Sequence, residues 1–179
     1  MAVEDLLKLK LIVVGNQSTG KSCILNRFVN ETFDEHYQAT IGLDFQSKNV
    51  TIHDQDVRLI LYDTAGQEKF RSLAKMFFKD AAVALLVYDI TTKKSFDEIK
   101  SYWMNLVKEN GPKKVIMYIV GNKNDLIEQQ QVKEEEVREY ATNQKVSIWL
   151  TSAKTSNGID ELFEEIGKKY LSPDFTNKI

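Results

Sequence analysis

The segment GNQSTGKS, residues 15–22, is the strongest indicator of the fold, because it joins the apolar run LIVV, residues 11–14, to a helical pattern that starts near Ile24. Its form is G-x-x-x-x-G-K-[S/T], the pattern of a phosphate-binding loop between a strand and a helix. Gly15 and Gly20 let the backbone curl so that successive N–H groups point at a phosphate, and the helix adds its positive N-terminal end. The segment therefore predicts a phosphate site at the end of a strand.

Two side chains supply the chemistry of this loop. Lys21 is expected to reach the terminal phosphates, and Ser22 to offer its hydroxyl to Mg²⁺. The middle residues, 17–19, include no glycine, but the pattern requires none there. The alternative interpretation is a tight turn with an exposed lysine. The apolar run before the loop and the helical pattern after it favour the phosphate site.

The apolar runs outside the loop predict an α/β fold. Runs that are almost continuously apolar are typical of parallel strands buried on both faces, whereas alternating runs are typical of an antiparallel hairpin. The continuous runs are residues 9–14, 82–88 and 115–120, the alternating ones are 49–52 and 57–62, and a last short strand is expected at 146–150.

Amphipathic stripes with a 3.6-residue period lie between these strands and predict helices. They cover residues 24–28, 96–107 and 159–170. Ser95 and Glu98 predict a capping box at the start of the second helix, and Asn157-Gly158 marks the start of the third. Strands that alternate with helices imply right-handed crossovers and a doubly wound sheet.

Length and composition limit the classes of protein. A chain of 179 residues fits one domain, which we place at residues 1–171, with 172–179 as the start of a tail. The net charge of -2 gives no reason to expect a nucleic-acid partner. One cysteine excludes an internal disulfide, and no apolar run approaches the roughly 20 residues that span a bilayer. We therefore expect a soluble protein, and we also expect it to be a monomer.

The segment DTAGQ, residues 63–67, follows the second hairpin strand and adds a second phosphate signal. Asp63 at a strand's carboxyl end is well placed to orient the water shell of a metal ion, and Gly66 can approach a terminal phosphate through its N–H. An ordinary Asp-Thr turn is the alternative when the segment is considered alone.

The segment NKND, residues 122–125, predicts which base is bound. Guanine presents two donors on one edge, N1–H and the exocyclic amine, and a carboxylate accepts both. Adenine lacks this pair of donors, so a buried carboxylate discriminates against it. Without the other motifs, NKND could also be a polar loop.

Taken together, GNQSTGKS, DTAGQ, NKND and TSAK, residues 151–154, resemble the Ras superfamily of small GTPases in order and over almost the whole chain. The segments YQATIGLDFQSK, LYDTAGQEKFRS and LLVYDIT are similar to the Rab branch, most of all to its Golgi-associated subgroup. The resemblance implies a Ras-like P-loop GTPase fold with six mostly parallel strands, one antiparallel edge strand and about five helices. It also implies a vesicle-traffic switch on the cytosolic face of intracellular membranes.

Site roles also follow from this resemblance. Thr40 would sense the γ-phosphate and join Ser22 and Asp63 at Mg²⁺, while Gln67 would orient the attacking water beside the catalytic Lys21. The residues implied to bind GTP or GDP are Gln17, Ser18, Thr19, Gly20, Lys21, Ser22, Cys23, Phe33, Thr40, Gly66, Asn122, Lys123, Asp125, Ser152, Ala153 and Lys154.

The implied partners are an exchange factor, a GTPase-activating protein, a GDP-dissociation inhibitor and Rab effectors. Effectors would contact Ile41, Phe45, Tyr62 and Phe77. Tyr62 replaces the usual tryptophan of the family, so aromatic character is kept while polar detail differs. The C-terminal cysteines that anchor Rab proteins through prenyl groups do not occur in this sequence, and we expect that this tail was removed.

Two alternatives remain open from the sequence. A binding module that holds GTP without hydrolysing it would share all four motifs, although Gln67 argues against it. An ATP-using small-molecule kinase would share the phosphate loop but would have no need of NKND. Cys23, Trp103 and Trp149 are interpreted as packing residues rather than as a nucleophile or a binding platform.

Overall fold

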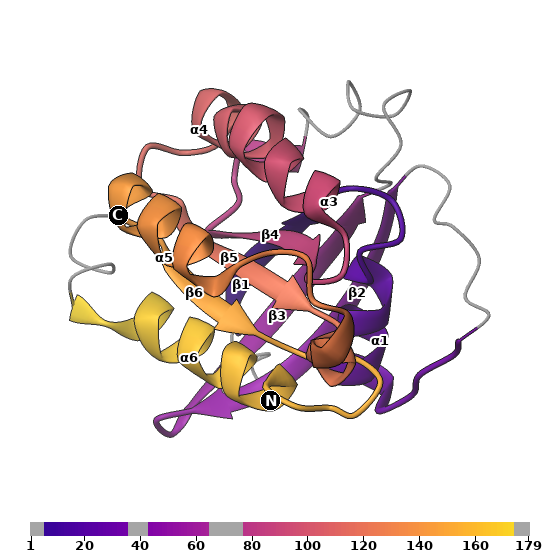
Figure 1. Cartoon of the computed structure of the whole chain (residues 1–179). Coiled ribbons are helices and arrows are strands. Elements are labelled where there is room, and N and C mark those ends of the chain that lie inside the picture. The colour runs from indigo at the N-terminus through magenta and orange to yellow at the C-terminus, as the bar shows by residue number, and fades with distance from the viewer. Residues whose placement is uncertain (1–5, 36–42, 65–76, 174–179) are drawn as a thin grey trace, which may run out of the picture.

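The computed structural model describes residues 6–35, 43–64 and 77–173 of the chain. Six strands form one sheet in the order β2-β3-β1-β4-β5-β6, and only β2 runs antiparallel to its neighbour (Figure 1). The strands are β1 (Leu7–Val14), β2 (Leu43–Ile52), β3 (Gln55–Thr64), β4 (Val83–Asp89), β5 (Ile116–Asn122) and β6 (Ser147–Leu150). This confirms the doubly wound, mostly parallel sheet with an antiparallel edge.

The turn of the β2–β3 hairpin is shorter than the sequence predicts. The register pairs Ile52 with Gln55, so only His53 and Asp54 connect the strands, rather than four residues. Both connecting residues have positive φ, 49° and 60°. A two-residue turn of this kind matches the twist of the strands that it joins, so pairing continues to the tip.

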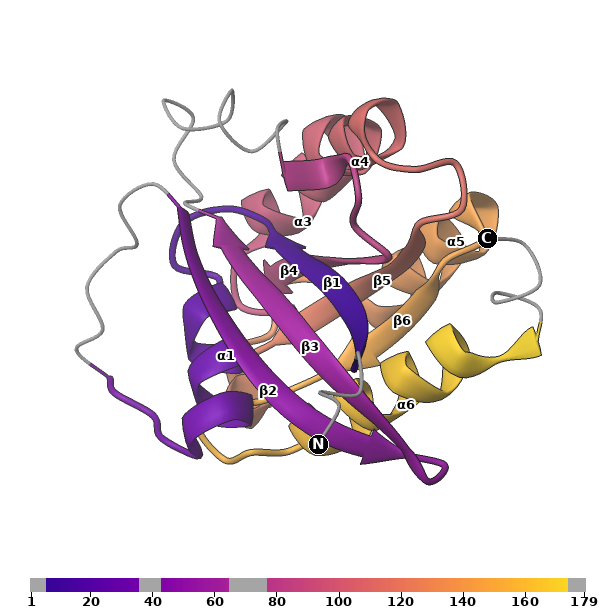
Figure 2. The same cartoon turned by 180° about the vertical axis from the view of Figure 1, so that it is seen from behind.

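Helices cover both faces of the sheet, as Figures 1 and 2 show from opposite sides. One core, on the side of α1 and α6, includes Leu25 and Phe163; the other, on the side of α3 to α5, includes Phe96 and Trp103. The helices are α1 (Lys21–Asn30), α3 (Lys93–Glu98), α4 (Met104–Asn110), α5 (Glu134–Gln144) and α6 (Ile159–Leu171), with a π-helical turn, Ile99–Trp103, between α3 and α4 and a 3₁₀ turn at Asn124–Gln129.

The starts of two helices test the sequence signals. Gly158, with φ 70°, immediately precedes α6, so the Asn157-Gly158 signal is confirmed. The capping box at Ser95 is wrong, because α3 begins at Lys93 and Ser95 lies inside it. The Ser95 hydroxyl instead donates to the carbonyl of Thr92 at 2.7 Å.

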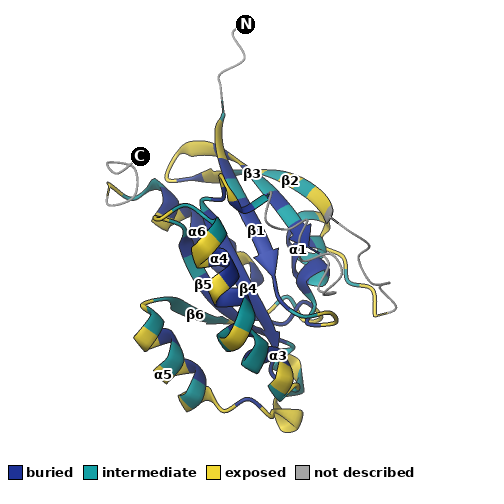
Figure 3. Cartoon of the chain, turned by 90° about the horizontal axis from the view of Figure 1, so that it is seen from above, coloured by how far each residue is buried: buried dark blue, intermediate teal, exposed yellow. Residues whose placement is uncertain are grey.

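The carboxyl ends of the parallel strands meet at one edge of the sheet. Gly15 follows β1, Asp63 lies at the end of β3, and Asp89 and Asn122 end β4 and β5. The central strands are the most buried part of the molecule, whereas the outer helices expose one face each (Figure 3). Because these strands are buried, the loops at this edge are held by a rigid core.

Of the helices described, none is long and apolar enough to cross a membrane.

Candidate nucleotide-binding site

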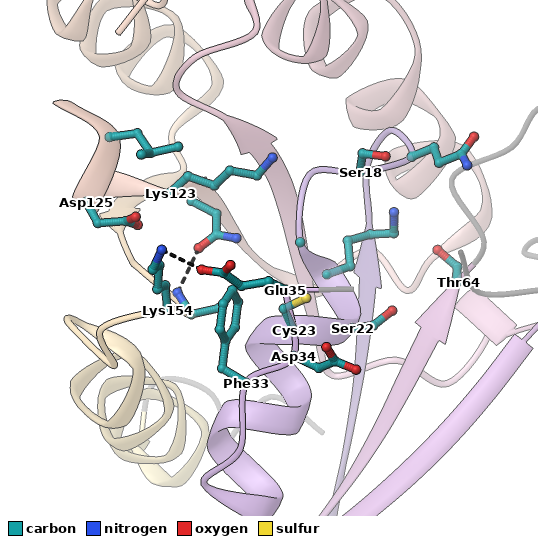
Figure 4. A pocket seen from close by; sticks show the side chains of 16 residues that line it. Ser18, Ser22, Cys23, Phe33, Asp34, Glu35, Thr64, Lys123, Asp125 and Lys154 are labelled. Atoms are coloured by element: carbon teal, nitrogen blue, oxygen red, sulfur yellow. Dashed lines mark hydrogen bonds and ion pairs between the residues drawn. The ribbon is translucent and has the colours of Figure 1, made fainter. Parts of the chain in front are cut away.

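A pocket of about 510 Å³ opens at the carboxyl edge of the sheet, between the phosphate loop and the loops after β5 and β6 (Figure 4). Most residues that the sequence assigns to the nucleotide meet here. The lining residues are Gln17, Ser18, Gly20, Lys21, Ser22, Cys23, Phe33, Asp34, Glu35, Thr64, Asn122, Lys123, Asp125, Leu126, Ala153 and Lys154. The predicted Thr19 and Ser152 lie beside this wall, buried against it.

The phosphate loop keeps its shape through backbone conformations that favour glycine. Gly20 has φ 91°, and a Cβ there would lie 2.2 Å from Asn122 Nδ2. Gly15 has φ 144°, and a Cβ there would lie 2.2 Å from the carbonyl oxygen of Val87. Ser18 also has positive φ, 64°, so the glycine-free middle of the loop still adopts a left-handed turn. The cradle thus requires no glycine at residues 17–19.

Lys21 lies at the start of α1 and is 6% exposed. Its Nζ donates to the carbonyls of Gly15 at 3.0 Å and Asn16 at 2.8 Å, so the ammonium is held across the mouth of the loop. Burial lowers the pKa of Lys21 from 10.5 to about 8, and the nearby Asp63 opposes this shift. A bound phosphate would supply the negative charge that keeps this ammonium protonated.

Ser22 and Asp63 form an oxygen pair at the metal end of the pocket. The Ser22 hydroxyl donates to Asp63 Oδ2, and both residues are buried. A hydroxyl and a carboxylate beside a phosphate cradle suit Mg²⁺, which is bound by few protein oxygens together with phosphate and water. Across residues 6–35, 43–64 and 77–173, no group of three or more His, Cys, Asp or Glu is placed to hold a metal by itself. The residues present therefore fit Mg²⁺ held jointly with a nucleotide.

The base end of the pocket is organised around Asn122. Its Nδ2 donates to the carbonyl of Thr19 at 3.0 Å, and its Oδ1 accepts from Thr151 Oγ1 and from the backbone N–H of Ala153. One amide thereby connects the phosphate loop, the end of β5 and the loop after β6. This side chain lines the pocket and also braces it.

Asp125 is positioned by a neighbouring hydroxyl. Ser152 Oγ donates to Asp125 Oδ1 at 2.6 Å, and the backbone N–H of Thr155 donates to Ser152 Oγ at 3.1 Å. The chain of bonds leaves the carboxylate at the pocket wall, where Figure 4 shows it. A carboxylate oriented in this way can accept the two donors of guanine.

Three further predicted residues complete the wall. Lys154 Nζ pairs with Glu35 Oε1 at 2.5 Å, as Figure 4 shows, and closes the pocket beside Phe33. The guanidinium of Arg27 lies 6.0 Å from the centre of the Phe33 ring. Cys23 is half-buried in the wall, and burial raises the pKa of its thiol. A neutral thiol is a poor nucleophile, in keeping with its interpretation as a packing residue.

Four predicted residues lie outside the described part of the chain. They are Thr40, Ile41, Gly66 and Gln67. Their roles stay predictions.

The three described residues of the predicted effector surface form one aromatic row. The ring centres of Phe45 and Tyr62 are 6.4 Å apart, and those of Tyr62 and Phe77 are 5.7 Å apart. Lys10 Nζ lies 4.9 Å from the centre of the Tyr62 ring, and Phe45 is 67% exposed. The row therefore presents an aromatic surface that the fold leaves partly open.

Sequence reasoning missed Asp89 as part of the site. Its Oδ2 pairs with Lys123 Nζ at 2.6 Å, and its Oδ1 accepts from both the backbone N–H and the hydroxyl of Thr91. Asp89 thus orients the lysine of NKND from the neighbouring strand. The signal was present in the sequence, since Asp89 ends a buried strand at the same edge as NKND.

The comparison with known protein families agrees with this geometry. A model of the Ras family matches residues 10–172, which include every strand end that lines the pocket. The chain belongs to the Ras family. It is a small GTPase switch that binds guanine nucleotide, and proteins of this family bind GTP or GDP with Mg²⁺ and interact with exchange factors, activating proteins and effectors.

Proposed function

We propose that this GTPase is a Rab-type switch that recruits effectors in its GTP form to regulate vesicle traffic, with Golgi membranes as its site of action. The aromatic row carries the proposal. Phe45, Tyr62 and Phe77 come from β2, β3 and the segment before β4, yet the rings of Phe45 and Phe77 each lie beside the ring of Tyr62. An exposed aromatic row is a typical anchor for a protein partner.

Hydrolysis in this proposal depends on charge placed around the terminal phosphate. Lys21 would stabilise negative charge on the phosphate oxygens. Ser22 and Asp63 would hold Mg²⁺, which would supply further positive charge there. Gln67 orients the attacking water, and Thr40 detects the γ-phosphate. No arginine occurs in residues 15–22, so we expect a slow intrinsic rate, on the order of 10⁻⁴ s⁻¹, and acceleration by an arginine from an activating protein.

The switch in this proposal acts as a monomer on the cytosolic face of membranes. A prenylated tail would attach it, and a GDP-dissociation inhibitor would extract it. Two switch segments are implied by the family resemblance, one containing Thr40 and one containing Asp63, Gly66 and Gln67. Loss of the γ-phosphate would release both and so remove the surface that effectors bind. The domain proposed to do this spans residues 1–171.

Single-turnover GTP hydrolysis tests the switch chemistry. The wild-type protein should release phosphate slowly and faster with a cognate activating protein, whereas Gln67→Leu should bind GTP normally and hydrolyse it at least tenfold more slowly. Equal rates for the two proteins would remove Gln67 from its role. A purified effector of Golgi-associated Rab proteins tests the Rab assignment separately, because it should bind this protein loaded with a non-hydrolysable GTP analogue and should not bind its GDP form. Absence of binding would contradict that assignment while leaving the GTPase itself intact.

A further inference from the structure

Trp103 makes a polar contact with the phosphate loop. It is fully buried beneath the loop, and its indole Nε1–H donates to Asn16 Oδ1 at 2.8 Å. The two residues are 87 positions apart in the sequence and belong to the helical layer and the loop after β1. Packing alone does not require this bond, because an apolar side chain of similar size would fill the same space.

The local helix geometry is unusual at this position. The π-helical turn, Ile99–Trp103, interrupts the helical segment between α3 and α4, and the backbone N–H of Met104 donates to the carbonyl of Ile99. Single π turns inside helices are often found at functional sites. The extra residue in this turn changes the direction of the side chains that follow, and Trp103 ends the turn facing the sheet core.

Together with the carbonyl of Gly15, Asn16 also helps to fix the resting position of Lys21. Its backbone carbonyl accepts from Lys21 Nζ at 2.8 Å and from Thr19 Oγ1 at 2.9 Å. The side chain of the same residue is held by Trp103. One end of Asn16 is therefore anchored in the helical layer, while its peptide orients the side chains of the loop.

We propose that Trp103 is a positioning residue for nucleotide binding, which acts through Asn16 to hold the phosphate loop in its binding-competent shape. The bond concerns the nucleotide site of the Ras-family domain, so its test is independent of the Rab-type role proposed above. Its loss should loosen the loop and speed nucleotide release. A net effect of one hydrogen bond corresponds to a change of roughly three- to tenfold in rate.

The test measures release of a fluorescent GDP analogue from the folded protein with Mg²⁺. Asn16→Leu removes the acceptor, and Trp103→Phe removes the donor while keeping an aromatic ring. Each should release GDP roughly three- to tenfold faster, and the double variant should be no faster than the quicker single variant. Asn16→Asp keeps an acceptor oxygen and should restore the wild-type rate.

Trp149→Phe is the matched control. It removes an indole N–H that donates to the carbonyl of Gly158 at 2.9 Å. Neither Trp149 nor Gly158 belongs to the phosphate loop or lines the pocket. Its release rate should equal that of the wild type. The proposal would be overturned if the double variant released GDP faster by the product of the two single effects, or if Asn16→Leu released GDP at the wild-type rate. If Trp103→Phe does not fold, the pair Asn16→Leu and Asn16→Asp decides the matter alone.

The fluorescence emission wavelength of Trp103 gives a second measurement, which reports on the hydrogen bond of its indole N–H. The chain has two tryptophans, so Trp149→Phe leaves Trp103 as the only indole. In that background Asn16→Leu should shift the emission of Trp103, because the indole N–H loses its acceptor, whereas Asn16→Asp should shift it less. Identical emission from all three proteins would contradict a hydrogen bond between Trp103 and Asn16 in solution.

Discussion

The two ends of the nucleotide pocket are built by different means. At the base end, side chains bond to one another and to backbone across three loops, with Asn122 at the centre and Ser152 holding Asp125. At the phosphate end, the backbone itself forms most of the site, and positive φ at Gly20 gives the loop its shape. One buried side chain, the ammonium of Lys21, adds charge. A phosphate needs many N–H donors and charge, whereas a base needs donors and acceptors in one fixed pattern. Affinity for phosphate and choice of base therefore depend on different residues and can be changed separately.

The largest effect is expected where the two ends touch. Gly20→Ala places a Cβ 2.2 Å from Asn122 Nδ2 and strains a residue with φ 91°, so it breaks the bond from Asn122 to Thr19 as well. We expect GDP to bind about 100-fold more weakly, from backbone strain plus a lost buried hydrogen bond. Equilibrium titration with a fluorescent GDP analogue measures this.

The control for this variant is Gly167→Ala on α6. A Cβ there would lie 1.9 Å from Ile52 Cδ1, so this variant should lose stability without losing GDP affinity. Equal affinities of Gly20→Ala and wild type would contradict the coupling of the two ends.

Base choice should change without damage to the phosphate end. Asp125→Asn replaces an acceptor oxygen by an amide NH₂ group, which is a donor: it opposes the donors of guanine and suits the extra carbonyl of xanthine. We expect a loss of about 2 kcal/mol for GDP and tighter binding of XDP than of GDP. Competition between the two nucleotides measures the preference, and Asp160→Asn, on the exposed face of α6, is the control. An unchanged preference would contradict the role of Asp125.

Alkaline pH should weaken the phosphate end alone. Burial lowers the pKa of Lys21 to about 8, below its ordinary 10.5, so between these values the unfolded chain binds more protons at Lys21 than the nucleotide-free folded protein does. The contribution of Lys21 to the free energy of unfolding therefore rises with pH in this window, while phosphate binding must restore the lost proton. We expect GDP affinity to fall about tenfold from pH 7 to pH 9.

Calorimetry in two buffers of different ionisation enthalpy checks this at pH 9. Binding of GDP to the nucleotide-free protein should take up close to one proton there. A binding heat that is the same in both buffers would show that Lys21 stays charged without phosphate.

The smallest effect is expected at Asp89, which lies at the end of β4 and supports the loop at residues 122–125. Asp89→Asn removes the carboxylate that pairs with Lys123, a lysine whose side chain is one-third exposed. Solvent screens such a pair, so we expect GDP release to become only two- to fivefold faster, or roughly 0.5 to 1 kcal/mol. Asp97→Asn, in a surface ion pair with Lys93 away from the pocket, is the control and should leave the release rate unchanged. A larger effect of Asp97→Asn than of Asp89→Asn would contradict this support.

Much of the fold was predictable, because buried parallel strands produce continuous apolar runs such as residues 82–88. Strand ends were less predictable. Leu43–Ile52 extends six residues before the predicted start at 49, because its early part pairs with β3 at an exposed edge, where side chains need not be apolar. The capping box failed because Ser95 bonds to Thr92 instead of starting the helix.

The site was predictable where a motif fixes the chemistry, as at Lys21 and Asp125. The supports of these residues could not be predicted in the same way. Asp89 reaches Lys123 from another strand, and Trp103 reaches Asn16 from the helical layer. Contacts of this kind depend on tertiary packing. Periodicity alone identifies Asp89 only as the end of a strand and Trp103 only as part of a core stripe.

The guanine site is tested most directly by the identity of the nucleotide that the purified protein releases when it is denatured. Chromatography of the supernatant should show GDP or GTP at close to one molecule per chain, because the base end accepts the two donors of guanine and the phosphate end holds at least two phosphates. Release of ADP or ATP instead would contradict the account of the site.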